Sequence, residues 1–142
     1  EPVVFEALTD WTTNSNDLIK YYSGTAVYKS SFKLDAAPDG NHILIDLGDF
    51  VAMARVKVNG QDAGGLWTAP YTLDITDLVK AGDNEVEIEV VNTWLNRLIG
   101  DLNLPEAKRT TWAAINSWKA DSPLQKAGLF GPVVIESVDY AE

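Results

Sequence analysis

The chain has 142 residues, 46% of them hydrophobic, which is enough for one domain with a substantial buried core. Its net charge of −10 argues against nucleic acid and anionic membrane surfaces as partners, because both need a basic face. The lack of cysteine excludes a disulfide framework and thiol chemistry, and no apolar run approaches the ~18 residues of a membrane helix.

Short segments with strand periodicity dominate the first part of the chain. We expect a short strand at Val3–Ala7, then a loop over residues 8–22 with one helical turn near Asp17–Lys20. Apolar and polar residues alternate over residues 24–34, which predicts a strand with one buried face. His42–Leu47 is a further apolar strand that ends at a glycine.

The middle of the chain carries the clearest pattern. Ala54–Val58 alternates apolar and charged residues, and Asn59-Gly60 follows it as a two-residue hairpin turn. Residues 64–71 are rich in glycine and aromatic residues and are predicted to leave the sheet. From Glu85 the alternation is strict, with glutamates on one face and Val86, Ile88 and Val90 on the other, so we expect an acidic solvated face over an aliphatic core.

Strand periodicity stops after Asn92. Residues 93–131 are predicted to be a long loop, with short helices at 110–118 and 122–127 and Gly128 as a C-cap. A last strand follows at 133–138. The pattern as a whole predicts a single all-β sandwich domain over residues 1–142, with one long loop carrying short helices.

The residues also resemble a known family. VKVNG and PYTLDITDLVKAGDNEVEIEVVN resemble the sugar-binding domain of family 2 glycoside hydrolases, a galactose-binding-like jelly roll. YYSGTAVYKSSF, NTWLNRLIGDLNLP and GLFGPVVI are closer to the C-terminal domain of family 106 rhamnosidase-like proteins. The resemblance spans residues 10–138 and implies a jelly-roll β-sandwich from a secreted or periplasmic glycoside hydrolase. The start at Glu1-Pro2, without methionine or signal peptide, also suggests a mature or excised fragment.

The sequence offers little for an autonomous active site. His42 is the one histidine, no serine has a nucleophile-elbow context, and there is no phosphate loop, dinucleotide fingerprint or zinc-ligand set. Asp101 and Glu106 lie in the long loop as an imaginable glycosidase pair, with solvated surface acids as the alternative. We therefore expect catalysis, if any, to come from elsewhere in a parent polypeptide.

A structural calcium ion is the one cofactor that the resemblance raises. Galactose-binding folds often hold such an ion, and several aspartates could supply its oxygen ligands. No contiguous calcium loop is present, so the metal site is left open. The candidate ligands are Asp46, Asp49, Asp74 and Asp77.

The aromatic and amide residues predict a carbohydrate site. A sugar offers an apolar ring face to an aromatic side chain and hydroxyls to amide or charged groups beside it. In family 2 enzymes the loop after the V-x-N strand end reaches towards the sugar site, which implies roles for Asn92, Asn96 and Asp101. If the two loops leave the same end of the sheet, their candidates converge. The full predicted set is Trp67, Tyr71, Asn92, Trp94, Asn96, Arg97 and Asp101.

Three functions remain open from the sequence. The first is a non-catalytic accessory domain that packs on a glycoside hydrolase catalytic domain and lends loop residues to a glycan site. The second is a structural interdomain module without a sugar site, whose long loop is an interdomain interface and whose exposed tryptophans are buried by the partner domain. For the single residues of that loop, the alternative to a sugar site is that Trp94 and Trp112 anchor it to the sandwich and that Arg97 pairs with an acid such as Asp101. The third is a free-standing carbohydrate-binding module.

Overall fold

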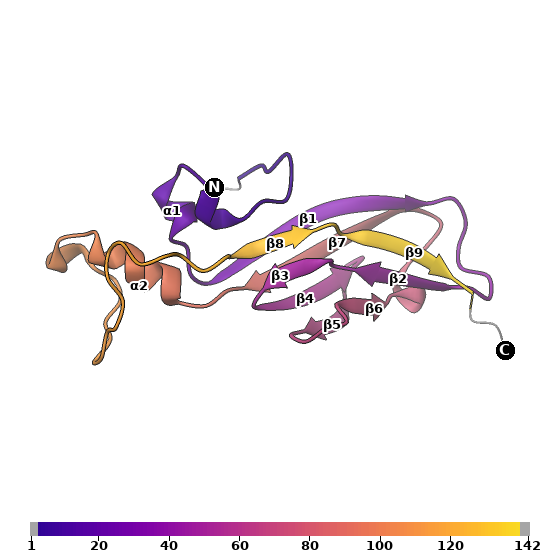
Figure 1. Cartoon of the computed structure of the whole chain (residues 1–142). Coiled ribbons are helices and arrows are strands. Elements are labelled where there is room, and N and C mark those ends of the chain that lie inside the picture. Colours follow the sequence, from indigo (N-terminus) through magenta and orange to yellow (C-terminus); the bar gives the residue numbers. More distant parts are fainter. Residues whose placement is uncertain (1–2, 140–142) are drawn as a thin grey trace.

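A computed structural model describes residues 3–139 and shows a β-sandwich with a helical extension at one end (Figure 1). Within these residues one sheet has the strand order β1-β7-β4-β5. The facing layer contains the sheet β6-β2-β9 and the pair β3-β8. The strands are β1 Thr25–Leu34, β2 His42–Asp46, β3 Asp49–Val51, β4 Met53–Val58, β5 Gln61–Leu66, β6 Thr72–Asp74, β7 Gly82–Val91, β8 Gly128–Gly131 and β9 Val134–Val138.

The period-2 pattern of the sequence fixes which face of the central strands is buried. In β7, Val86, Ile88 and Val90 are buried, while the glutamates between them face outwards. Lys29 on β1 lies 3.0 Å from Glu87, so the outer face carries a cross-strand ion pair. All pairings in this sheet are antiparallel, and the predicted all-β sandwich is confirmed.

One hydrophobic core lies between the two layers. Ile43 and Ile45 of β2 pack in the same cluster as Val56 of β4 and Ile88 of β7. Ile45 and Val56 are fully buried. A sandwich needs such a shared core because each sheet is apolar on only one face.

The hairpin between β4 and β5 is the predicted one. Asn59 has φ 51° and Gly60 has φ 78°, the two positive values that a type I′ turn requires. The prediction that the chain leaves the sheet at Gly64 was wrong, because β5 continues to Leu66. The glycine-rich segment lacks alternating side chains, but its backbone can still pair with β4. A register shift beside Val56 accommodates this pairing.

The N-terminal segment contains helical turns instead of the strand expected at Val3–Ala7. A 3-10 turn η1 covers Trp11–Thr13 and a helix α1 covers Asp17–Lys20, the second of which was predicted. The side chains of Asp10 and Asn16 accept hydrogen bonds from the backbone at the two helix starts. The strand predicted at Val3–Ala7 is wrong, because no neighbouring strand pairs with these residues. Their apolar side chains alone do not make a strand.

Helices also occur in the long connection, but at other positions than predicted. The helix α2 spans Leu95–Leu102, and 3-10 turns occur at η2 Thr76–Leu78 and η3 Glu106–Lys108. The described residues 110–118 and 122–127 form no helix, and Gly128 begins β8 instead of capping one. The missed helix has its own signal, since Leu95, Leu98, Ile99 and Leu102 follow the i, i+3, i+4, i+7 spacing.

The side chain of Asp74, at the end of β6, makes a compact polar cluster with β2 and η2. Its Oδ1 accepts hydrogen bonds from the Thr76 hydroxyl and amide, and its Oδ2 lies 2.6 Å from His42 Nδ1. Thr76 Oγ1 in turn accepts from the Ile43 amide. The hydrogen bonds from Thr76, followed by the one from His42, lower the pKa of Asp74 to about 2.

Replacing the Thr76 hydroxyl should raise the pKa of Asp74. We expect Thr76→Val to move it from about 2 towards 3.8, while Thr76→Ser, which keeps the hydroxyl, leaves it near 2. Because folding lowers this pKa, the associated stabilisation is present above pH 3.8 and is lost as the pH falls towards 2. Carboxyl ¹³C NMR titration measures both variants, and an unchanged midpoint in Thr76→Val would contradict the assignment.

Candidate functional site

The two loops that carry the predicted carbohydrate site leave the sandwich at the same end. Ala54 of β4 pairs with Leu66 on one side and with Val90 on the other. The segments that follow β5 and β7 therefore emerge together, next to the start of β1, where Thr25 pairs with Val91. The sequence could not establish this shared end, and the strand register does.

Two of the predicted aromatic residues are open to solvent at this end. Trp67 follows β5 and Trp94 precedes α2, and each is 67% exposed. Tyr71 differs, because its ring is partly buried 4.5 Å from the ring of Phe50 and belongs to the core packing. Exposed indoles are the groups of this site that could stack on a sugar ring.

Asn92 holds the turn before β1 and points its polar atoms into the protein. Its Oδ1 accepts a hydrogen bond from the Gly24 amide at 2.9 Å. Its Nδ2 donates to the carbonyl oxygen of Tyr22 at 2.8 Å. Both functional groups of the amide are therefore engaged by the chain itself.

Asn96, on the buried side of α2, also uses its side-chain amide to hold a segment of backbone. Its side chain is 2% exposed. The Nδ2 donates to the carbonyl oxygen of Gln125 at 2.6 Å, and the Oδ1 accepts from the amide of Gln125 at 2.8 Å. This two-point contact fixes the end of the long connection against the helix.

Asp101 fixes the beginning of the same connection. It is 2% exposed, pairs with Arg97 one helical turn earlier, and accepts hydrogen bonds from Thr110 and Thr111. The amides of both threonines lie 2.7 Å from Oδ2, and their hydroxyls also donate to this atom. Among the described residues, Arg97 Nε is a buried nitrogen without a hydrogen-bond partner.

The electrostatics of Asp101 suit a permanent anion. Burial by itself raises the pKa of its carboxyl, but hydrogen bonds from Arg97, Thr111 and Thr110 outweigh burial and hold the pKa below its usual value. A glycosidase general acid needs the opposite, a raised pKa. Glu106, its imagined catalytic partner, is exposed on η3. The predicted pairing of Arg97 with Asp101 is confirmed. The anchoring of the loop by Trp94 and Trp112 is wrong, because these side chains are 67% and 81% exposed.

The aspartates considered as calcium ligands do not form a cluster. In residues 3–139, no three His, Asp or Glu side chains are grouped closely enough to hold a metal ion. Asp46 Oδ1 accepts from the Gly48 amide, and Asp74 contacts His42 and Thr76. Nor does any helix of the described chain have the length and apolar character needed to cross a bilayer.

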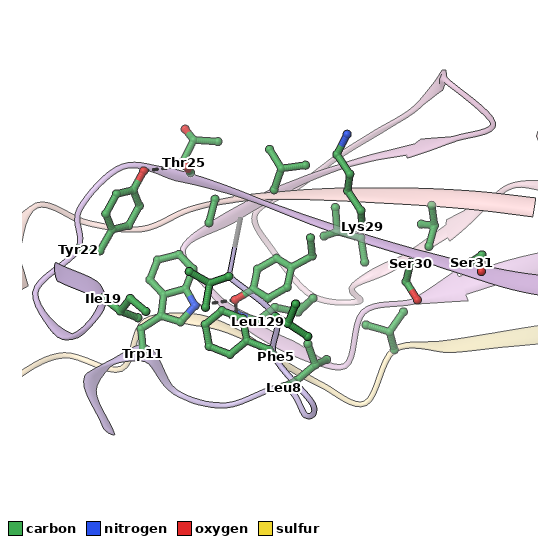
Figure 2. A pocket seen from close by; sticks show the side chains of 18 of the residues that line it. Phe5, Leu8, Trp11, Ile19, Tyr22, Thr25, Lys29, Ser30, Ser31 and Leu129 are labelled. Atoms are coloured by element: carbon green, nitrogen blue, oxygen red, sulfur yellow. Dashed lines mark hydrogen bonds between the residues drawn. The ribbon is translucent and has the colours of Figure 1, made fainter. Parts of the chain in front are cut away.

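A cavity of about 980 Å³ lies on another side of the sandwich, between β1 and the N-terminal segment. Figure 2 shows Phe5, Leu8 and Trp11 gathered there with Leu129. The Tyr28 hydroxyl accepts from Trp11 Nε1 at 2.6 Å and from the Leu129 amide at 3.2 Å, so this polar group is already engaged. Trp11 is 3% exposed and is a core residue.

The family of this chain follows from its similarity to known proteins. Residues 7–124 match the family described as "Glycosyl hydrolase 2 galactose-binding domain-like". This chain belongs to that family. The resemblance inferred from the strand and turn motifs is thereby confirmed, and the galactose-binding-like fold agrees with the antiparallel sandwich.

Individual relatives of this galactose-binding-like domain are glycoside hydrolases by name. A rhamnosidase from Novosphingobium sp. PP1Y is 42% identical, with a TM-score of 0.82 over 89% of the chain. A Formosa agariphila protein named "Putative beta-glucuronidase" is 37% identical over 94% of the chain. A β-D-glucuronidase from Dictyoglomus thermophilum shares the fold, at 24% identity and a TM-score of 0.53 over 61% of the chain.

The domain corresponds to a small part of each relative. It spans 12% of the rhamnosidase, 14% of the Formosa agariphila protein and 15% of the Dictyoglomus thermophilum enzyme. Most of each relative thus lies outside the region compared.

Removing the charge of Asp101 should release the segment that it holds. We expect Asp101→Asn to lower the hydrogen-exchange protection of the Thr110 and Thr111 amides about thirtyfold, or about 2 kcal/mol, because a buried charged acceptor is lost. Glu106→Gln, which changes an exposed acid on the same segment, is the matched control.

Acid should have the same effect as that substitution. The pKa of Asp101 is lowered on folding, so its stabilisation is present above the ordinary value of 3.8 and is lost as the pH falls below it. Protection factors at these two amides that stay constant in Asp101→Asn would contradict the role of this carboxylate.

Proposed function

We propose that this chain is a non-catalytic accessory domain of a glycoside hydrolase, which packs on the catalytic domain and brings Trp67 and Trp94 to the edge of its glycan site. The observation that carries the proposal is the position of these two indoles, each 67% exposed, on loops that leave the same end of the sandwich. Flat, exposed aromatic rings suit the apolar face of a sugar.

The chemistry of the proposed parent is hydrolysis of a glycosidic bond. Such a reaction needs two carboxyl groups on either side of the scissile bond, one of which must have a raised pKa. Asp101 is an engaged anion, so we assign the acid and the base or nucleophile to the rest of the polypeptide. The names of the relatives suggest rhamnosides and glucuronides as the first substrates to test.

A second candidate function has its own support. Asn92, Asn96 and Asp101 direct their polar atoms into hydrogen bonds within the chain, which leaves fewer groups for sugar hydroxyls. In a structural interdomain module without any sugar contact, these side chains would serve only to hold the loops in place. Their predicted role as glycan ligands stays a prediction.

The test compares single substitutions in the intact polypeptide that contains this chain. We expect Trp67→Ala and Trp94→Ala each to raise KM for an oligosaccharide about fivefold, or ~1 kcal/mol, since one stacking contact is lost. Leu18→Ala, which truncates a side chain 75% exposed on α1, is the control with unchanged KM.

The chain by itself supplies the complementary measurement. We expect no saturable amide NMR shifts with millimolar rhamnose or glucuronic acid, because the domain would own only part of the site. Saturable shifts at Trp67 and Trp94 would favour a free-standing carbohydrate-binding module. Unchanged KM in both tryptophan variants would favour the structural module.

A further inference from the structure

The long connection forms an arm that extends past α2, away from the sheets (Figure 1). We define the arm as residues 105–126. Its regular structure is limited to the 3-10 turn η3 at Glu106–Lys108. An irregular segment of this length in a compact domain usually serves a function of its own.

The arm is fixed at both ends by buried polar side chains of α2. Asp101 holds Thr110 and Thr111 near its start, and Asn96 holds Gln125 near its end. Between them, Asn103 Nδ2 donates to the Ala120 carbonyl at 3.2 Å. Part of the entropy cost of ordering the arm is thus already met within the domain, which favours binding to a partner.

The middle of the arm presents large apolar side chains to solvent. Trp112 is 81% exposed, Ile115 is 89% exposed and Trp118 is 43% exposed. Aromatic residues are enriched in the centre of protein interfaces, and an exposed group of apolar side chains marks such a surface. Ile115 has no group that would bind a sugar hydroxyl, so the chemistry favours a protein partner.

The charge of the arm is opposite to that of the rest of the domain. It contains four Lys or Arg and two Asp or Glu, a net charge of +2, so the remaining residues carry −12. Lys108, Arg109 and Lys119 flank the apolar side chains in the sequence. A matching partner surface is therefore apolar at its centre and acidic at its rim.

The size of this surface indicates where the partner lies. Stable interfaces between separate proteins bury about 800 Å² on each side around an apolar centre, and the arm offers only three large exposed apolar side chains for such a centre, Trp112, Ile115 and Trp118. A small interface suffices when both sides belong to one polypeptide, because the effective concentration is then in the millimolar range. The relatives, of which this chain spans 12% and 14%, contain ample further chain to supply such a partner.

We infer that the arm docks into an apolar groove with an acidic rim on the remainder of the polypeptide, with Trp112 and Ile115 inserted. The inference rests on the proposed function, since it names the contact through which the accessory domain packs on its catalytic domain. Asp101 and Asn96 act as positioning residues, because they hold the arm without touching the partner.

Hydroxyl-radical footprinting of the intact polypeptide and of the 142-residue chain tests the docking. We expect Trp112 to be oxidised at least about tenfold more slowly in the intact polypeptide, while Leu18, which is 75% exposed on α1, reacts equally in both. Equal oxidation of Trp112 in the two samples would overturn the inference. Protection that grows with the concentration of the short chain alone, together with dimers in ultracentrifugation, would assign the arm to a second copy and also overturn it.

Substitutions separate this inference from the proposed function. Lys108→Glu with Arg109→Glu, and Ile115→Ser, should restore Trp112 oxidation in the intact polypeptide towards the rate of the short chain, while Glu106→Gln should not. Trp67→Ala should raise KM and leave Trp112 protected. Unprotected Trp112 in an active, Trp67-dependent enzyme rejects the docking alone. A protected Trp112 with KM independent of Trp67 and Trp94 rejects the glycan role alone.

Discussion

The buried carboxylate of Asp101 is the group on which the structure of the helical end of this domain depends. A charge with 2% exposure is stable inside a protein only when its partners replace the water that it has lost. Arg97 supplies the opposite charge, and Thr110 and Thr111 supply amide and hydroxyl donors. One side chain of a short helix therefore determines where an otherwise irregular segment begins.

Buried amides do the corresponding work elsewhere in the described chain. An amide side chain donates and accepts at once, so it can satisfy a backbone N–H and a backbone C=O together. Asn96 does this with Gln125, and Asn84, which is fully buried, does it with Lys80 while also accepting from Asn59. Buried polarity in this domain is thus used to fix loops on a sandwich that has little regular structure outside its strands.

The sequence predicts the sandwich better than it predicts the site. Strict alternation in β7 and the Asn59-Gly60 turn are local signals, and both elements are where they were expected. The strand predicted at Val3–Ala7 is absent, because apolar residues there have no neighbouring strand to pair with. The leucine and isoleucine residues of α2 have the spacing of an amphipathic helix. The helix was missed because a loop was expected after the V-x-N strand end. The pairing of Asp101 with Arg97 is local and could be predicted. The contact of Asn92 with Gly24, 68 positions earlier, and those of Asp101 with Thr110 and Thr111 depend on the fold, so no local sequence pattern predicts them.

These internal contacts give the amide and acidic residues after β7 a structural role. Such a cluster is typical of a sugar site, yet the same groups are also those that hold a loop to its own domain. Because the polar atoms of Asn92, Asn96 and Asp101 are engaged within the chain, the exposed groups that stand out near these loops are apolar: two indoles at the end of the main sheet and the large side chains in the middle of the arm. The arm carries a net charge of +2 and the remaining residues carry −12, so the two parts of the chain have opposite electrostatic character. The arm therefore differs from the rest of the domain in both charge and apolar exposure.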